Sequence, residues 1–146
     1  MESAVDFVVE SPLTDDLLLV EAKSISSPSA EWAGKLARSV LGPAASHTNR
    51  FLLLVLRNYL YLWKHHPQEG TELPDFSART EEVLEPYLKD VQTSLHDISG
   101  ISFELLVKSW LTDLSEGSVP PSVEKWIRAA GLQQFENGVL REEQRN

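Results

Sequence analysis

The chain has 146 residues, a length that suits one domain built around one hydrophobic core. Hydrophobic residues make up 42% of it and charged residues 24%, values typical of globular proteins, which excludes a disordered or fibrous chain. No apolar run is long enough to cross a bilayer, and cysteine is absent. We therefore expect a soluble cytoplasmic protein with no membrane contact, no disulfide and no cysteine nucleophile.

The net charge of -9 is spread unevenly along the chain. Residues 1–66 hold six Lys and Arg against seven Asp and Glu, whereas residues 67–146 hold seven against fifteen. Nucleic-acid binding depends on cationic side chains, which displace the counterions of the phosphates. If the protein binds DNA, we expect residues 1–66 to make the contact.

The first part of the chain predicts strands around a helix. Residues 4–10 and 17–23 are rich in apolar and β-branched side chains and flank a stretch of turn formers, which predicts a hairpin. A helix is then expected, with Ser27 as its N-cap, Pro28 at its first position and a stop at Gly42 and Pro43. Residues 51–56 and 59–63 predict two further strands, and residues 65–77 predict a loop.

The acidic portion, residues 78–140, predicts helices packed on this core. Apolar positions recur at helical spacing over residues 83–91, where Pro86 is expected to kink the helix, and over residues 103–114, before Gly117. Ser122 is a candidate N-cap for a third helix that ends near Gly131. Residues 132–140 are ambiguous, and residues 141–146 are expected to fray.

The predicted hairpin brings charged side chains together. If its loop is centred between residues 13 and 14, Asp6 lies opposite Glu21. Strand alternation then places Val5, Phe7 and Val9 on an apolar face, and Asp6, Glu21 and Lys23 on the other face.

Like charges at opposing strand positions destabilise a sheet, and a divalent cation between Asp6 and Glu21 would compensate. Mg²⁺ or Mn²⁺ suits a site of two carboxylates, with Lys23 beside it to orient a water and to stabilise charge on a phosphate. The side chains therefore predict metal-assisted hydrolysis of a phosphodiester.

The spacing from Asp6 to Glu21-Ala22-Lys23, followed by a helix and a buried strand, resembles the PD-(D/E)XK nuclease superfamily. The resemblance covers about residues 4–64 and implies an α/β fold with a restriction-endonuclease-like mixed sheet. It implies that Asp6 and Glu21 are metal ligands and that Lys23 is the catalytic lysine of a DNA endonuclease.

Several segments, among them DFVVESP, LLLVEAK and FELLVKSWLTDL, are also similar to an uncharacterised family of bacterial proteins. Val5 stands where the nuclease motif has Pro. The superfamily core usually opens with a helix that packs on the sheet, whereas only three residues precede the first predicted strand. Either that helix is missing here, or a helix of the second half or of a partner chain replaces it.

Other side chains allow more than one interpretation. Lys35 and Arg38 lie on the exposed side of the predicted helix, where they bind phosphates or serve only as solvated charges. Tyr59 and Tyr61 share one face of a predicted edge strand, which would suit dimerisation or base stacking. Because the acidic helices would also suit a protein partner or a homodimer, the alternative to a nuclease is a non-catalytic binding or regulatory module with the same fold.

Overall fold

The computed structural model describes residues 5–41, 50–64, 73–89, 91 and 93–143. They form an α/β fold with a six-stranded mixed sheet and four α-helices. In chain order the elements are β1 (Phe7–Glu10), β2 (Leu17–Ala22), α1 (Ala30–Leu41), β3 (Arg50–Val55), β4 (Tyr59–Trp63), β5 (Phe76–Arg79), α2 (Thr80–Leu88), α3 (Gly100–Glu116), α4 (Pro121–Ala130), the 3₁₀ turn η1 (Gln133–Phe135) and β6 (Val139–Glu142).

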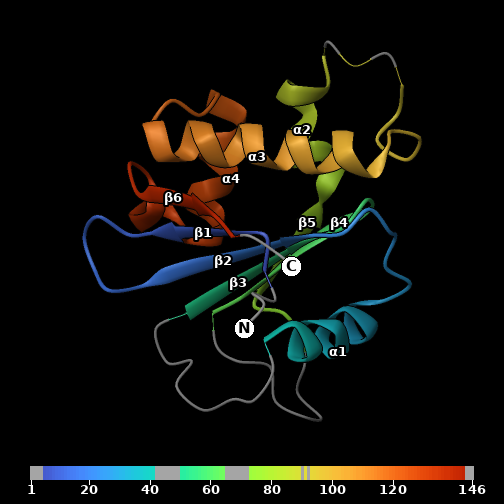
Figure 1. Cartoon of the computed structure of the whole chain (residues 1–146), viewed down its shortest axis with the longest axis horizontal. Coiled ribbons are helices and arrows are strands. Elements are labelled where there is room, and N and C mark those ends of the chain that lie inside the picture. Colours follow the sequence, from blue (N-terminus) through green and yellow to red (C-terminus); the bar gives the residue numbers. More distant parts are fainter. Residues whose placement is uncertain (1–4, 42–49, 65–72, 90, 92, 144–146) are drawn as a thin grey trace.

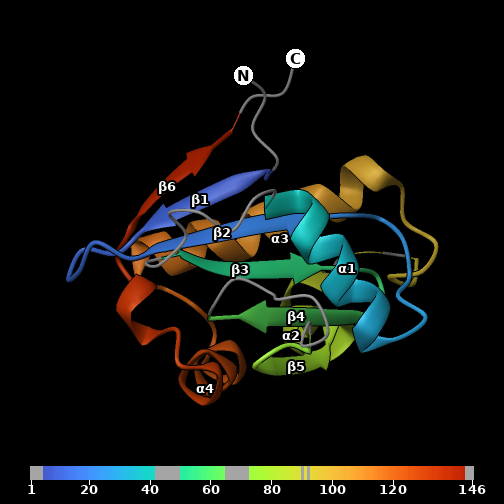
Figure 2. The ribbon, with the colours of Figure 1, turned by 90° about the horizontal axis from the view of Figure 1, so that it is seen from below.

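The sheet has the strand order β5-β4-β3-β2-β1-β6. β2 and β3 are parallel and are joined through α1, while the other neighbouring strands are antiparallel. Helix α1 covers one face of the sheet, and α2, α3 and α4 cover the other (Figure 1). Figure 2 shows α1 crossing β2, β3 and β4 on its face.

Each face of the sheet has its own apolar core. On the α1 face, Val8, Leu19, Leu54 and Tyr61 pack with Ala33, Ala37 and Val40 of α1. On the face of α2, α3 and α4, alternate strand residues pack against the helices; among the buried members are Phe7, Val9, Leu18, Val20, Leu53, Trp110, Leu111 and Ile127. The apolar runs of β2, β3 and β4 are therefore continuous because these strands are covered on both faces.

The expected helices of the second half are present. Helix α3 carries the predicted apolar stripe and ends at Gly117, whose φ of 68° is the left-handed conformation that glycine adopts readily. Helix α4 ends at Gly131 in the same way, with a φ of 76°. Pro86 lies inside α2, and the helix continues through it to Leu88. Among the helices of the described residues, none is long and apolar enough to cross a membrane.

Two strands differ from the sequence-based expectation. Residues 76–79, expected as loop and helical portion, form the edge strand β5, which pairs with β4. Residues 139–142, expected to end the helical portion and begin a frayed tail, form β6, which pairs with β1. Both segments are short and are held by backbone hydrogen bonds to distant partners, which side-chain periodicity does not record. The expected tail residues 144–146 lie outside the described residues.

Two helix caps also differ from expectation. Helix α1 begins at Ala30, and its cap is Ser29, whose Oγ accepts a hydrogen bond from the Trp32 N–H at 3.1 Å. Ser27 is instead buried, and its Oγ donates to the Ser29 carbonyl at 2.7 Å. Helix α4 begins at Pro121, before Ser122, because proline suits a first helical position whose N–H has no partner within the helix.

Candidate functional site

The β1–β2 register brings Asp6 beside Glu21. The pairs Phe7–Val20, Val8–Leu19, Val9–Leu18 and Glu10–Leu17 confirm the predicted hairpin register. The ladder ends at Phe7–Val20, and Asp6, directly before β1, lies against the Glu21–Ala22 peptide near the end of β2. The hairpin therefore has its loop at one end and this acidic pair at the other.

The backbone turns at Asp6 in a way that the sequence did not predict. Its N–H donates to the Val20 carbonyl at 2.9 Å, whereas its carbonyl accepts from the Glu143 N–H, beyond the end of β6, also at 2.9 Å. In a regular strand both groups of one residue point to the same neighbour, so the ladder is interrupted here as in a β-bulge. The predicted face of Val5 is therefore wrong: Val5 packs in the core under α1 with Val8, whereas Phe7 packs in the opposite core.

This turn places the Asp6 carboxylate against the backbone of β2. Its Oδ2 accepts a hydrogen bond from the Ala22 N–H at 2.8 Å, at the peptide that joins Glu21 to Ala22. Asp6 is only 9% exposed and Glu21 only 2%. The fold thus buries two carboxylates at adjoining positions, which is costly unless charge or hydrogen bonds compensate them.

Lys23 completes the charged group. Its Nζ lies 3.6 Å from Glu21 Oε2, and 35% of its side chain is exposed. The Lys23 N–H donates to the Val55 carbonyl at 3.0 Å and so extends the pairing of β2 with β3 beyond Ala22. Lys23 therefore has a fixed backbone and an ammonium group that lies between the buried Glu21 and solvent.

Arg57 fixes the segment that follows Lys23. It lies in the turn between β3 and β4, and its N–H donates to the Ile25 carbonyl at 2.8 Å. Its guanidinium donates to three carbonyl oxygens, of Ser24 at 2.7 Å, Leu95 at 2.8 Å and Ile98 at 2.9 Å. The turn before α1 is thereby tied to the segment that precedes α3.

The donor set fits a hard divalent cation. Mg²⁺ is bound in proteins by one or two carboxylates and keeps water or phosphate oxygens at its other positions, and Asp6 and Glu21 would supply the carboxylates. Within the residues that the structure describes, no group of three or more His, Cys, Asp or Glu side chains gathers to hold a metal ion. A metal ion at this position would therefore have two carboxylate ligands, Asp6 and Glu21, from the described part of the chain.

The two predicted phosphate-binding residues lie on α1. Lys35 is exposed and Arg38 is half-buried, in the last turn of the helix. Glu21 lies opposite Leu54 of β3, whose side chain packs under α1. Lys35 and Arg38 therefore belong to the helix that covers the same face of the sheet as Glu21.

The prediction that Tyr59 and Tyr61 lie on an edge strand is wrong. Their strand β4 is an inner strand because β5 pairs with its outer side, through Tyr59–Arg79 and Tyr61–Ser77. Tyr61 is buried, whereas Tyr59 is 41% exposed at the strand end. Of the described strands, β5 and β6 form the two edges of the sheet.

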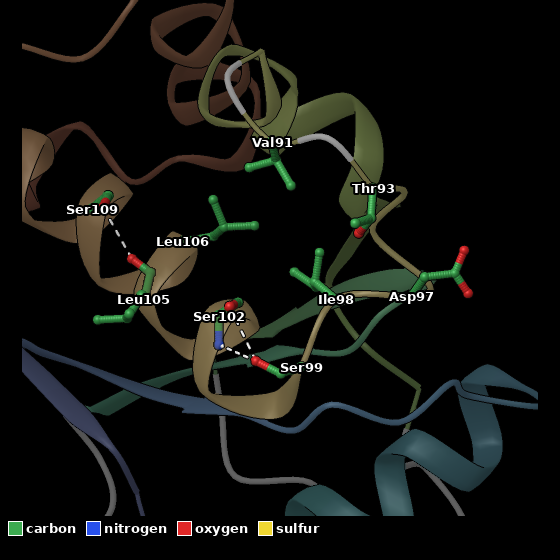
Figure 3. Close-up of a pocket in the computed structure, with 9 residues that line it drawn as sticks. All are labelled: Val91, Thr93, Asp97, Ile98, Ser99, Ser102, Leu105, Leu106 and Ser109. Atoms are coloured by element: carbon green, nitrogen blue, oxygen red, sulfur yellow. Dashed lines mark hydrogen bonds between the residues drawn. The ribbon is translucent and has the colours of Figure 1, made fainter.

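A separate cavity of about 450 Å³ lies between the first half of α3 and the segment that joins α2 to α3. In Figure 3, Val91, Ile98 and Leu106 point toward one another, while the Asp97 carboxylate points away. The Ser99 hydroxyl caps α3 by accepting from the Ser102 N–H at 3.0 Å. The Ser99 hydroxyl also donates to Ser102 Oγ, and the Ser109 hydroxyl donates to the Leu105 carbonyl, so these hydroxyls are engaged within α3. We assign no function to this cavity.

Comparisons of the chain with models of protein families, with curated proteins and with solved structures found no match.

Proposed function

We propose that the protein is a Mg²⁺- or Mn²⁺-dependent nuclease that hydrolyses DNA phosphodiester bonds at Asp6, Glu21 and Lys23. The observation that carries this proposal is the pair of buried carboxylates at adjoining strand positions, with a lysine ammonium 3.6 Å from Glu21. A bound cation would stabilise both carboxylates beyond what the Ala22 N–H and the Lys23 ammonium supply.

The proposed fold is restriction-endonuclease-like. The order β1, β2, α1 and β3 supplies a hairpin, a crossover helix and a strand parallel to the second strand, as the resemblance implies. Helix α3 packs on the face opposite α1 through Phe103, Val107 and Trp110. We propose that α3 takes the place of the helix that usually opens the superfamily core.

Each side chain of the site has a distinct role in the proposed reaction. Asp6 and Glu21 would hold the metal ion, which when bound supplies positive charge that polarises the phosphodiester. The Lys23 ammonium orients a water molecule and stabilises negative charge that develops on the phosphate oxygens. The water oxygen bonds to phosphorus, the bond from phosphorus to the leaving oxygen breaks, and the leaving oxygen takes up a proton.

A cleavage assay on labelled DNA tests this proposal. We expect cleavage in Mg²⁺ or Mn²⁺ that EDTA abolishes, and losses of at least about a hundredfold in Asp6→Asn, Glu21→Gln and Lys23→Ala. Glu10→Gln is the matched control, because Glu10 lies at the other end of the hairpin and is 46% exposed. Undiminished cleavage in the three site variants would reject this site.

Thermal melts separate metal binding from chemistry. Millimolar Mn²⁺ should raise the Tm of the wild type, of Glu10→Gln and of Lys23→Ala, because binding to the folded state stabilises it. The rise should disappear in Asp6→Asn and Glu21→Gln. Without any rise in the wild type, the alternative of a non-catalytic binding module, which the net charge of -9 favours, would replace the nuclease.

A further inference from the structure

A second group of polar side chains lies at the same end of the sheet as Asp6 and Glu21. The registers pair Ala22 with Val55, Val55 with Leu60, and Tyr59 with Arg79. Lys23 follows Ala22 and Leu56 follows Val55, so the parallel register of β2 and β3 places Lys23 opposite Leu56. The Leu56 N–H donates to the Tyr59 carbonyl at 3.0 Å, which continues the pairing of β3 with β4. Lys23, Leu56, Tyr59 and Arg79 therefore form one row across four neighbouring strands.

This row lies on the α1 face of the sheet. Leu56 and Tyr61 both pack in the core under α1, whereas Phe76 and Ala78 of β5 pack against the opposite core. Strand alternation then places Tyr59 and Arg79 on the α1 face. At about 4.8 Å per strand, Tyr59 lies about 10 Å and Arg79 about 14 Å along the row from Lys23.

Tyr59 and Arg79 line a cavity of about 230 Å³ at the sheet end. Its lining residues are Arg57, Asn58, Tyr59, Arg79, Glu81 and His96. The Arg57 guanidinium donates to three carbonyl oxygens and is not available to a ligand. Arg79 lies 4.0 Å from Glu81, a long contact between side chains that are each more than 60% exposed. Such an exposed pair is weak, so the Arg79 guanidinium remains available to a phosphate.

The Tyr59 ring packs against another aromatic ring and is partly exposed to solvent. It stacks on Tyr61, with ring centroids 6.0 Å apart and an angle of 30° between the planes. Tyr61 is buried, and its hydroxyl donates to Ser27 Oγ at 3.3 Å, which fixes the lower ring. With 41% of its surface exposed beside cationic groups, Tyr59 has the properties of a stacking platform for a nucleic-acid base.

We propose that this cavity binds one nucleotide of a single-stranded segment of DNA, with the base on Tyr59 and a phosphate at Arg79. A base stacks on a side chain only when it is unpaired, which favours single strands over duplex. The row from Lys23 to Arg79, about 14 Å, spans about four nucleotides at the stacked spacing of about 3.4 Å. That the bound strand is also cleaved rests on the proposed nuclease function, whereas the binding of the strand at Tyr59 and Arg79 does not depend on it.

Fluorescence anisotropy with a labelled 12-nucleotide single strand and the matching duplex, in EDTA at low salt, tests the proposal without cleavage. We expect the single strand to bind more tightly, Tyr59→Ala to weaken its binding at least about fivefold, and Tyr59→Phe to retain it. Arg79→Gln should lower the slope of log affinity against log salt by about 0.7. Arg128→Gln is the matched control, since Arg128 is 67% exposed and lies in the helix layer on the opposite face.

The outcomes for binding and cleavage are distinguishable. If Tyr59→Ala and Arg79→Gln, both folded by their thermal melts, bind the single strand as the wild type does, the nucleotide site is wrong even if DNA is cleaved. If these variants lose binding but no metal-dependent cleavage occurs, the nucleotide site stands and the nuclease proposal fails. Equal affinity for duplex and single strand, or binding of single-stranded RNA alone, would also overturn the inference.

Discussion

The two ends of the β1–β2 hairpin each carry a glutamate beside a cation, yet the fold treats the two pairs differently. Glu10 contacts Arg141 at 3.0 Å, with 46% and 49% of their side chains exposed. Glu21 lies 3.6 Å from Lys23 but is only 2% exposed, and a second buried carboxylate, Asp6, adjoins it. The exposed ion pair is worth little stability, whereas the buried group is the one to which we assign the proposed metal site.

The loop end shows what a purely structural polar cluster looks like here. Ser11 Oγ accepts from the Leu13 and Thr14 N–H groups and donates to the Gln134 carbonyl at 3.0 Å. Thr14 Oγ1 donates to Gln134 Oε1 at 2.8 Å. These side chains provide hydrogen-bond partners for the N–H groups of the turn and attach the turn to η1. None of them carries a buried charge.

Replacing one arginine near each end of the hairpin should give the largest difference in stability between the two ends. Arg57→Met should lower the free energy of unfolding by about 3 kcal/mol or more, because three carbonyl oxygens lose their charged donor. Arg141→Met removes an exposed ion pair and should cost less than about 1 kcal/mol. Urea denaturation measures both, and similar losses in the two variants would contradict the difference between the ends.

Gly138 provides a change confined to the loop end. A Cβ at this position would meet the backbone carbonyl oxygens of Glu10 and Phe135, neither of which is a movable side-chain atom. Gly138→Ala should therefore destabilise the protein by about 2 kcal/mol in urea denaturation. The Mn²⁺-dependent rise in Tm should persist in this variant, and its loss would show that the two ends are not independent.

Tyr87 gives a smaller effect that lies in the helix layer, away from both ends. Its hydroxyl donates to Asp113 Oδ2 at 2.6 Å and joins α2 to α3, so Tyr87→Phe should cost about 1 kcal/mol at neutral pH. Burial, and then the Asp113 carboxylate, raise the pKa of Tyr87 above its ordinary value of 10.0.

The folded state thus keeps Tyr87 protonated at a pH where the unfolded chain ionises. The stabilisation is complete below pH 10.0 and is lost as the pH rises from there toward the folded-state pKa. The free energies of unfolding of the wild type and of Tyr87→Phe should therefore converge as the pH rises above 10.0. Urea denaturation repeated in buffers from neutral to alkaline pH measures both. A constant difference across that range would disprove the assigned hydrogen bond.

The smallest effect is expected for Glu10→Gln. Its ion pair with Arg141 is exposed, so the variant should lose less than about 0.5 kcal/mol, and high salt should remove even that difference. Urea melts at low and high salt make the measurement. If Glu10→Gln lost as much free energy of unfolding as Arg57→Met, solvent exposure would not explain the difference in stability between the two ends.

The sequence predicted the features that depend on local pattern. Turn formers between two apolar runs set the hairpin register, and the stripe of Phe103, Val107 and Trp110 before Gly117 predicted α3. That register predicted that Asp6 and Glu21 lie at the same end of the hairpin, and the turn at Asp6 then sets its carboxylate against the Ala22 N–H. The burial of both carboxylates was not predictable, because the pattern of a single strand does not show which elements cover its end.

What the sequence could not predict depends on non-local pairing. The alternation in Phe76-Ser77-Ala78-Arg79 is a strand pattern, but four residues beside a helix are too few to separate it from a loop. Without β5, Arg79 had no assigned face, and its place in the row with Lys23 and Tyr59 stayed hidden. The turned backbone at Asp6 likewise arises from two neighbours, β2 and the residue after β6, that no local pattern reveals.

The pairing of Phe7 with Glu142 has a consequence for how the protein is made. A ribosome makes the chain from its N-terminus, so Asp6 is synthesised long before Glu143, whose N–H donates to the Asp6 carbonyl. The nascent chain therefore carries the acidic residues long before their final geometry exists. The backbone geometry at Asp6 can therefore form only after β6 has been synthesised, so the arrangement of these acidic residues is a late event in the folding of the nascent chain.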